Sequence, residues 1–192
     1  MVLFTTIRKE ERMIRSSYMT KCGKEVLVPE GTIKHLQAHP EVGALIEAGL
    51  LMLSIPDHLT ELKTEIDFGK VIGTCACVPV KENEPETFAY RTGRKNPTRV
   101  VLNAETTPCT TLVVVLVFRE HETTADYYCW YLITAYVGKV TPRKPWDRYF
   151  TTCGTPQEFQ EAFQFWSENG LVYDPAVMGP WFTGSWKQIL HL

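Results

Sequence analysis

The sequence predicts an α+β fold, in which N-terminal helices pack on a twisted antiparallel sheet of four to five strands and a C-terminal helix follows. Three observations predict it. Apolar residues recur every three or four positions up to about residue 53, β-branched residues dominate from about residue 70 to residue 137, and a helical period returns after residue 155. The strands are joined by hairpin-sized connections, which is typical of antiparallel pairing. Helices and strands are grouped along the chain instead of alternating, and this order favours the α+β class.

The composition is that of an ordinary globular protein. Of 192 residues, 44% are hydrophobic and 22% are charged, and the formal net charge is −2, which argues against a disordered or collagen-like chain. The longest apolar run, Leu112 to Phe118, suits a strand and is too short to span a membrane. The start, MVLFTTIRKEERMIRSS, lacks the roughly 7–15 apolar residues of a secretory signal. We therefore expect a cytoplasmic protein without a membrane partner, with an N-terminal extension over residues 1–28 and a single domain over residues 29–192.

The first expected elements are two helices. The first is expected over residues 30–38, because Pro29 suits the start of a helix and Pro40 disfavours the α conformation in the residue before it. The second helix has an apolar stripe that consists of Val42, Leu45, Ile46, Gly49, Leu50 and Leu53. It is expected to end at Pro56, and the segment SIPDHLTELK around this proline is read as a turn or a short helix.

Strands are expected from residue 70 onward. KVIGTCACVPV indicates one strand, and ETFAYRTGRKNPTRVVLN indicates two short strands around a loop over residues 92–97. The β-branched run from Thr110 to Phe118 is typical of a central strand with both faces covered. CWYLITAYVG predicts the last strand.

The last expected element is a helix from about Pro156 to Asn169. Thr155 is expected to be its N-cap and Gly170 the C′ residue that ends it. Its apolar stripe consists of Phe159, Ala162, Phe163 and Trp166. The C-terminal stretch MGPWFTGSWKQIL is expected to cover the core, with docking of a partner as the alternative.

The cysteines are expected to be reduced, structural thiols, because disulfide frameworks belong to small secreted domains. Cys75 and Cys77 are two residues apart, so that on a strand they share a face and can lie together in the core. No second close pair of Cys or His completes a zinc site, and no metal ligand is expected.

Three groups of residues are candidates for chemistry. His35 and His39, in KHLQAHP, share one helix face if the helix is unbroken and suit general acid–base chemistry, or else lie on the surface and at a turn. Arg91, Arg94 and Lys95 form a basic turn that suits a phosphate, or else keep a hairpin tip solvated; they lie in the segment YRTGRKNPTR, which also contains Arg99. Thr134 and Tyr136 bring two hydroxyls to one strand face opposite Ile133 and Ala135, which marks the wall of a site or the solvated face of a sheet.

The motifs that are absent exclude other classes of enzyme. The chain has no G-x-S-x-G elbow and no recognisable cysteine nucleophile motif. Neither G-x-G-x-x-G nor G-x-x-x-x-G-K-[ST] occurs, which argues against a nucleotide-dependent enzyme, and no cofactor is expected.

Four segments taken together resemble a known family. They are KHLQAHPEV, then the basic RTGRKNPTRVV strand pair, then LVVVLVF followed by YLITAYVG and PRKPWD, and finally EAFQFWSENGLVY. Their order resembles the metal-independent ribonuclease toxins of the barnase–EndoU–RelE-like superfamily, in particular bacterial and phage members whose last strands read T-A-Y/F followed by a Gly or Pro turn. The resemblance covers roughly residues 30–173, and TAYVG with PxxPWD is its most distinctive part. Such members often carry a His in the last helix motif, where this chain has Asn169-Gly170.

The resemblance implies RNA as the partner, and cleavage by attack of a 2′-hydroxyl on its own phosphodiester, without a metal or a cofactor. Such a reaction needs a base, an acid and cations that stabilise the phosphorane. It also implies an immunity or antitoxin protein as a possible second partner. In this reading His35, or His39, is the base or acid, Arg91, Arg94 or Lys95 stabilises the phosphate, and Thr134 and Tyr136 position it or relay a proton.

Two alternatives stay open at this point. One is a non-catalytic interaction protein on the same fold, such as a degenerate toxin relative, an immunity factor or a phage accessory protein, which the near-neutral charge and Asn169-Gly170 favour. The other is an enzyme that acts on a small metabolite. A nuclease is expected to bring His35, an arginine of the basic turn and Tyr136 into one cleft, whereas an interaction protein is expected to show a large apolar patch.

Overall fold

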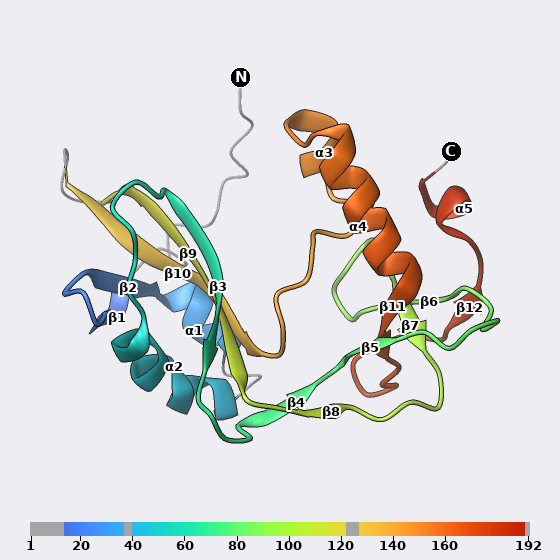
Figure 1. Cartoon of the computed structure of the whole chain (residues 1–192), viewed down its shortest axis with the longest axis horizontal. Coiled ribbons are helices and arrows are strands. Elements are labelled where there is room, and N and C mark those ends of the chain that lie inside the picture. The colour runs from blue at the N-terminus through green and yellow to red at the C-terminus, as the bar shows by residue number, and fades with distance from the viewer. Residues whose placement is uncertain (1–13, 37–39, 122–126, 191–192) are drawn as a thin grey trace. The chain divides into compact units, whose positions relative to one another are not determined.

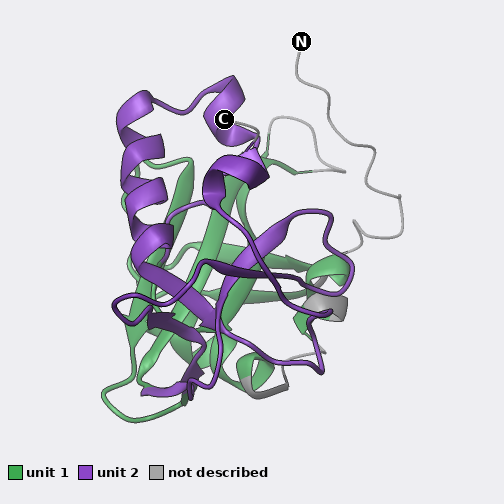
Figure 2. Ribbon diagram, turned by 90° about the vertical axis from the view of Figure 1, so that its right-hand side faces the viewer, with its two compact units in different colours: residues 1–73, 109–140 green, residues 74–108, 141–192 purple. Residues whose placement is uncertain are grey.

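The fold is mixed α+β, as the sequence predicts. The computed structural model describes residues 14–36, 40–121 and 127–190 (Figure 1). The prediction of a single antiparallel sheet is wrong, because the described residues form two five-stranded mixed sheets and a two-stranded sheet. The chain divides into two compact units: unit 1 comprises residues 1–73 and 109–140, and unit 2 comprises residues 74–108 and 141–192 (Figure 2).

Unit 1 is built on a sheet with the strand order β1-β2-β10-β9-β3. Neighbouring strands are antiparallel except β2 and β10, which run parallel through the pairs Val26–Trp130 and Leu27–Tyr131. The strands are β1 (Ile14–Met19), β2 (Glu25–Pro29), β3 (Glu61–Asp67), β9 (Thr111–Glu120) and β10 (Tyr128–Val137). Residues 14–28 of the expected extension thus supply β1 and most of β2, while the expected domain boundaries stay a prediction.

Two helices cover one face of this sheet. They are α1 (Glu30–Leu36) and α2 (Pro40–Met52), and they agree with the two helices that the sequence predicts. Their apolar residues pack on the sheet face that carries Val114, Leu132 and Ala135. The core of unit 1 also contains Val26, Val28, Leu36, Val42, Ile46, Leu50, Leu53, Ile55, Ile66, Leu112, Leu116 and Trp130.

One prediction in this region is right in part and another is wrong. SIPDHLTELK contains the expected turn at residues 57–58, but its last three residues enter β3, because Leu62 and Ile66 pack on the core while the alternate residues are exposed. The segment KVIGTCACVPV forms two short strands in place of one, β4 (Gly73–Cys75) and β5 (Cys77–Pro79). The two strands belong to different sheets, since β4 pairs with β8 (Thr107–Cys109) and β5 with β11 (Asn169–Val172).

Unit 2 contains the second five-stranded sheet, in the order β12-β6-β7-β11-β5. The predicted pair of strands around residues 92–97 is confirmed as β6 (Thr87–Tyr90) and β7 (Pro97–Val101). The remaining elements are β12 (Phe182–Thr183), α3 (Tyr149–Thr152), α4 (Pro156–Glu168) and α5 (Trp186–Leu190). The C-terminal stretch covers a core, as expected, because Trp186 is buried against Phe88 and Trp166.

The start of α4 is as predicted, and its end is not. Thr155 is the N-cap and forms a reciprocal capping box with Glu158. Gly170, however, lies in β11, and the helix passes directly into this strand at Asn169. A Cβ at Gly170 would lie 3.0 Å from Val101 Cγ2 and 3.3 Å from the Arg99 carbonyl oxygen. Glycine is therefore required for close packing against β7, and it does not supply a left-handed turn.

None of the helices in the described part of the chain is long and apolar enough to cross a membrane.

Candidate functional site

The two predicted hydroxyl-bearing residues, Thr134 and Tyr136, lie on β10 of unit 1. Ala135 is 1% exposed and belongs to the core. Because side chains alternate along a strand, Thr134 and Tyr136 project from the opposite face of the sheet, and both are partly exposed. This confirms that the two residues share a face.

A bulge in β10 precedes this pair. The pairing register between β10 and β9 shifts between Leu132 and Thr134. As a result, Ile133 is 42% exposed whereas Ala135 is buried, so the prediction that these two residues share a face is wrong. Bulges re-aim the side chains that follow them and often lie beside functional sites.

Helix α1 lies along β10 at this bulge. β2 pairs with β10 only as far as Tyr131, and α1 begins one residue after β2 ends. Thr32 Oγ1 on α1 donates a hydrogen bond to the Leu132 carbonyl, at 3.0 Å. The helix thus satisfies one carbonyl on the edge of β10 beyond the described β2 pairing, two residues before Thr134.

The predicted histidines are only partly described. Position 35 lies in α1, three residues after Thr32. The His35 side chain and the whole of His39 lie outside the described residues. Their roles stay predictions.

Charged residues share the sheet face of Thr134 and Tyr136. Strand register places Lys63, Val115 and Thr134 in one cross-strand row, and Glu65, Val113 and Tyr136 in the next. Glu65 Oε1 accepts a hydrogen bond from the Val140 backbone N–H at 2.6 Å. This bond ties the turn after β10 to β3 and fixes one wall of the site.

The predicted phosphate-binding residues belong to unit 2. Arg91, Arg94 and Lys95 lie in the loop between β6 and β7, and all three are exposed. The turn is closed by a hydrogen bond from the Arg94 N–H to the Arg91 carbonyl, and Gly93 in it has a φ of +74°. The positions of the two units relative to one another are not determined, so the shared cleft of histidine, arginine and tyrosine stays a prediction.

The PRKPWD segment has a structural role in unit 2. Trp146 Nε1 donates to the Pro97 carbonyl on β7 at 2.7 Å, and Trp166 Nε1 of α4 donates to the Pro142 carbonyl at 3.2 Å. The Lys144 ammonium lies 3.9 Å from the centre of the Trp166 ring. The segment thus ties α4 to the sheet of unit 2, and its distinctive sequence is explained by packing.

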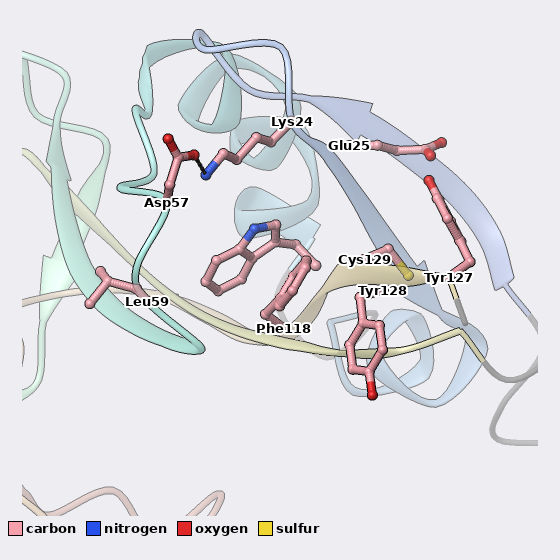
Figure 3. A pocket seen from close by; sticks show the side chains of 9 residues that line it. Lys24, Glu25, Asp57, Leu59, Phe118, Tyr127, Tyr128 and Cys129 are labelled. Carbon is pink, nitrogen blue, oxygen red and sulfur yellow. Dashed lines mark ion pairs between the residues drawn. The ribbon is translucent and has the colours of Figure 1, made fainter. Parts of the chain in front are cut away.

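A cavity of about 300 Å³ in unit 1 involves residues that the sequence analysis did not single out (Figure 3). Lys24 and Asp57 form an ion pair of 2.6 Å at its rim, and the Lys24 ammonium holds the pKa of Asp57 below its ordinary value. The Tyr127 side chain points toward Glu25 in Figure 3. The full lining is Lys24, Glu25, Asp57, Leu59, Phe118, Tyr127, Tyr128, Cys129 and Trp130.

This cavity offers aromatic surface beside charges. Tyr128 is 55% exposed, and its ring lies 5.8 Å from that of Phe118. The aromatic sequence YYCW at the start of β10 is the signal that sequence reasoning could have used. The charged residues of the cavity could not be found from this sequence, because Lys24 and Glu25 come from the β1–β2 hairpin and Asp57 comes from the segment before β3.

The cysteines are all free, as expected, and the pKa values of Cys22 and Cys77 are shifted in opposite directions. The exposed Cys22 Sγ lies 3.3 Å from Thr20 Oγ1 and accepts the Ile55 N–H at 3.4 Å. These hydrogen bonds lower the pKa of the Cys22 thiol. Burial raises the pKa of Cys77 to about 11, with the neighbouring Cys75 as a smaller cause.

Within residues 14–36, 40–121 and 127–190, no three His, Cys, Asp or Glu side chains gather so that they could hold a metal ion. The metal independence of the reaction stays a prediction.

Comparisons with protein-family models, with curated proteins and with solved structures find no match for this chain. The resemblance to the ribonuclease toxins therefore rests on the short motifs quoted above.

Proposed function

We propose that the chain is a metal-independent endoribonuclease of the toxin-like kind, which cleaves RNA by attack of a 2′-hydroxyl on the adjacent phosphodiester. The observation that carries the proposal is the hydrogen bond from Thr32 to the Leu132 carbonyl. It brings the helix that carries position 35 to the edge of β10 immediately before the residues Thr134 and Tyr136. The helix packs on the sheet face that carries Ala135, whereas Thr134 and Tyr136 project from the opposite face, so the proposal requires the substrate to bind at this edge of β10, where the two faces meet.

The chemistry assigns a role to each group. An imidazole can both accept and donate a proton near neutral pH, so His35 suits the removal of the 2′-proton or protonation of the leaving 5′-oxygen. The hydroxyls of Thr134 and Tyr136 donate hydrogen bonds to the phosphate oxygens, whose charge grows in the transition state. Lys63, in the cross-strand row of Thr134, adds a positive charge on the same sheet face.

The test is cleavage of a labelled RNA by the full chain in EDTA. We expect His35→Ala, or His39→Ala if that histidine acts, to lower the rate by about 10²–10⁴-fold, which is the usual contribution of general acid–base catalysis. Thr134→Val and Tyr136→Phe each remove one hydroxyl at nearly constant volume and are expected to lower the rate less. His58→Ala is the matched control, because His58 is exposed in the loop before β3. Equal rates for wild type and both histidine variants would remove the assignment.

The cavity beside Tyr128 favours a second candidate function, a non-catalytic binding module. Exposed aromatic rings next to an ion pair suit an organic ligand, and the volume is at the lower end of the range for ligand sites. No cleavage of any RNA, together with ligand binding that Tyr128→Ala abolishes, would establish this alternative. Under the ribonuclease proposal, an immunity or antitoxin protein is the expected inhibitory partner.

A further inference from the structure

An exposed basic loop and exposed aromatic rings lie next to one another in unit 2. The loop is the tip of the β6–β7 hairpin, where Tyr90 and Pro97 form the last residue pair. The facing segment is residues 177–183, which leads into β12. The Thr92 N–H donates to the Val177 carbonyl at 3.0 Å, and the Gly179 N–H donates to the Tyr90 carbonyl at 2.9 Å. The name "hairpin-tip surface" is used below for Tyr90, Arg91, Arg94 and Lys95.

The charge of this surface is of one sign. Residues 87–104 contain four basic residues and no Asp or Glu, and residues 175–183 contain no charged residue at all. One of the four basic residues, Arg99, is buried, and its Nη1 forms an ion pair with Glu86 at 3.0 Å. The other three are exposed, and none of them forms an ion pair with a described residue. A local positive field therefore exists on a chain whose net charge is −2.

The aromatic rings give this surface a second chemistry. Tyr90 is 46% exposed, and its ring is stacked on Phe182 with centroids 5.8 Å apart and an interplanar angle of 29°. Phe182 is in turn stacked on the buried Phe88, at 6.0 Å. Tyr90 is thus the exposed end of a ladder of three rings, with nearly half of its surface open to solvent. Trp181, 49% exposed, directly precedes Phe182, and because side chains alternate along a strand its ring projects from the other face of the sheet edge.

We propose that the hairpin-tip surface binds single-stranded RNA. Arg91, Arg94 and Lys95 contact phosphates, and a base stacks on Tyr90. Exposed cations beside exposed rings are the combination that single-stranded nucleic acid requires, because every base has a stacking face and every nucleotide a phosphate. A duplex hides its base faces and uses only the cations. An acidic protein would use the cations and leave the rings without a role.

The inference rests on the proposed function only for the choice of RNA as the nucleic acid. The inference concerns RNA binding by unit 2 and the proposed function concerns cleavage, so binding and cleavage are separate measurements. A chain that binds single-stranded RNA through this surface and does not cut it would overturn the ribonuclease proposal alone. A chain that cuts RNA with an unchanged KM in the Tyr90 and arginine variants would overturn this inference alone.

The experiment is fluorescence anisotropy with a labelled 12-nucleotide RNA and the full-length chain, with His35→Ala used if the wild type cuts the probe. Tyr90→Ala is expected to weaken binding about 5- to 100-fold, the usual effect of one lost base stack. Combined replacement of Arg91, Arg94 and Lys95 by Ala is expected to lower the slope of log K against log salt concentration by about 2, since each phosphate contact contributes about 0.7. Circular dichroism confirms that each variant is folded.

Two controls make the test local. Lys81→Ala removes an exposed cation of unit 2 outside this surface, and Trp181→Ala removes a half-exposed ring that projects from the other face of the sheet edge. Both are expected to leave RNA affinity unchanged. Equal loss in the controls, equal affinity for a 12-base-pair duplex, or equal affinity for polyglutamate would each overturn the proposal.

Discussion

Thr32 Oγ1 on α1 lies 3.0 Å from the Leu132 carbonyl oxygen on β10, and it occupies a position on the strand edge where a neighbouring strand would otherwise pair. The two residues are 100 positions apart in the sequence. This contact locates the helix of the predicted histidine against the strand of the predicted hydroxyls. The account of the site in unit 1 depends on it.

Replacement of Thr32 tests this contact. Thr32→Val keeps the shape and removes the donor, so that the free energy of unfolding is expected to fall by about 1 kcal/mol, the usual net value of one hydrogen bond. RNA cleavage is expected to fall by roughly 10- to 100-fold, because small displacements of catalytic groups are costly. Urea unfolding and a cleavage assay measure the two effects. Thr32→Ser keeps the donor and is expected to retain cleavage. A Thr32→Val variant with reduced stability and full activity would show that α1 has no role in the reaction.

Gly170 is predicted to be irreplaceable for a packing reason. Gly170→Ala forces a Cβ to within 3.0 Å of Val101 Cγ2 and 3.3 Å of the β7 backbone, and it is expected to destabilise the chain by about 1–3 kcal/mol. Gly43→Ala in α2 is the matched control, because a Cβ there meets nothing within 4 Å. That substitution is expected to be neutral or to stabilise by up to about 1 kcal/mol. A thermal shift in the same direction for both variants would contradict the close packing of β11 on β7.

The capping box of α4 is predicted to make stability depend on pH. The Glu158 carboxylate accepts the Thr155 N–H at 2.7 Å, and this and the bonds from the Thr155 and Tyr149 hydroxyls lower the pKa of Glu158. A carboxyl whose pKa is lower in the folded chain stabilises it above the unfolded value of about 4.5, and this contribution is lost as the pH falls through the folded value.

Urea unfolding measures this effect. Wild type is expected to exceed Glu158→Gln in stability at pH 7, and the difference is expected to shrink below pH 4.5. Thr155→Ala is expected to cost about 1 kcal/mol at neutral pH. A difference between wild type and Glu158→Gln that stays constant with pH would show that Glu158 does not act as the carboxylate of the box.

Cys22 is predicted to react with iodoacetamide at lower pH than an ordinary thiol, and Cys77 is predicted not to react in the folded chain. The thiolate is the reactive form, and hydrogen bonds from Thr20 and Ile55 favour it at Cys22. Burial disfavours it at Cys77, whose pKa is about 11. Peptide mass spectrometry after alkylation at several pH values measures both. Thr20→Val is expected to move the Cys22 profile to higher pH, and an unmoved profile would rule out the hydroxyl as the cause.

The sequence predicts the elements whose period is long and regular. Both N-terminal helices, the strands that contain Val114 and Leu132, and the helix capped by Thr155 are found where they are expected. The sequence did not predict the short strands correctly, because whether such a segment forms a strand depends on the residues that it packs against or pairs with. β3 exists because Leu62 and Ile66 face a core formed by distant residues, and Gly170 is in a strand because β7 lies against it.

The candidate site was predictable to a lesser degree. The shared face of Thr134 and Tyr136 follows from alternation, but the bulge at Ile133 does not, because a register shift is set by the partner strand. The approach of α1 to β10 needs the early end of the β2–β10 pairing, which no local pattern shows. The ladder of Tyr90, Phe182 and Phe88 joins residues about 90 positions apart, and only the tertiary structure brings them together.

The chemistry of the cleaved ends is the most direct test of the proposed reaction. Wild-type protein in EDTA, incubated with an RNA that carries one 2′-deoxy substitution at a mapped cleavage position, is expected to leave that position intact and to cut the unmodified RNA. The products are expected to carry 2′,3′-cyclic phosphate and 5′-hydroxyl ends, because the 2′-oxygen is the attacking group. Cleavage at the 2′-deoxy position, or 5′-phosphate ends that appear only when a divalent metal is supplied, would contradict the account.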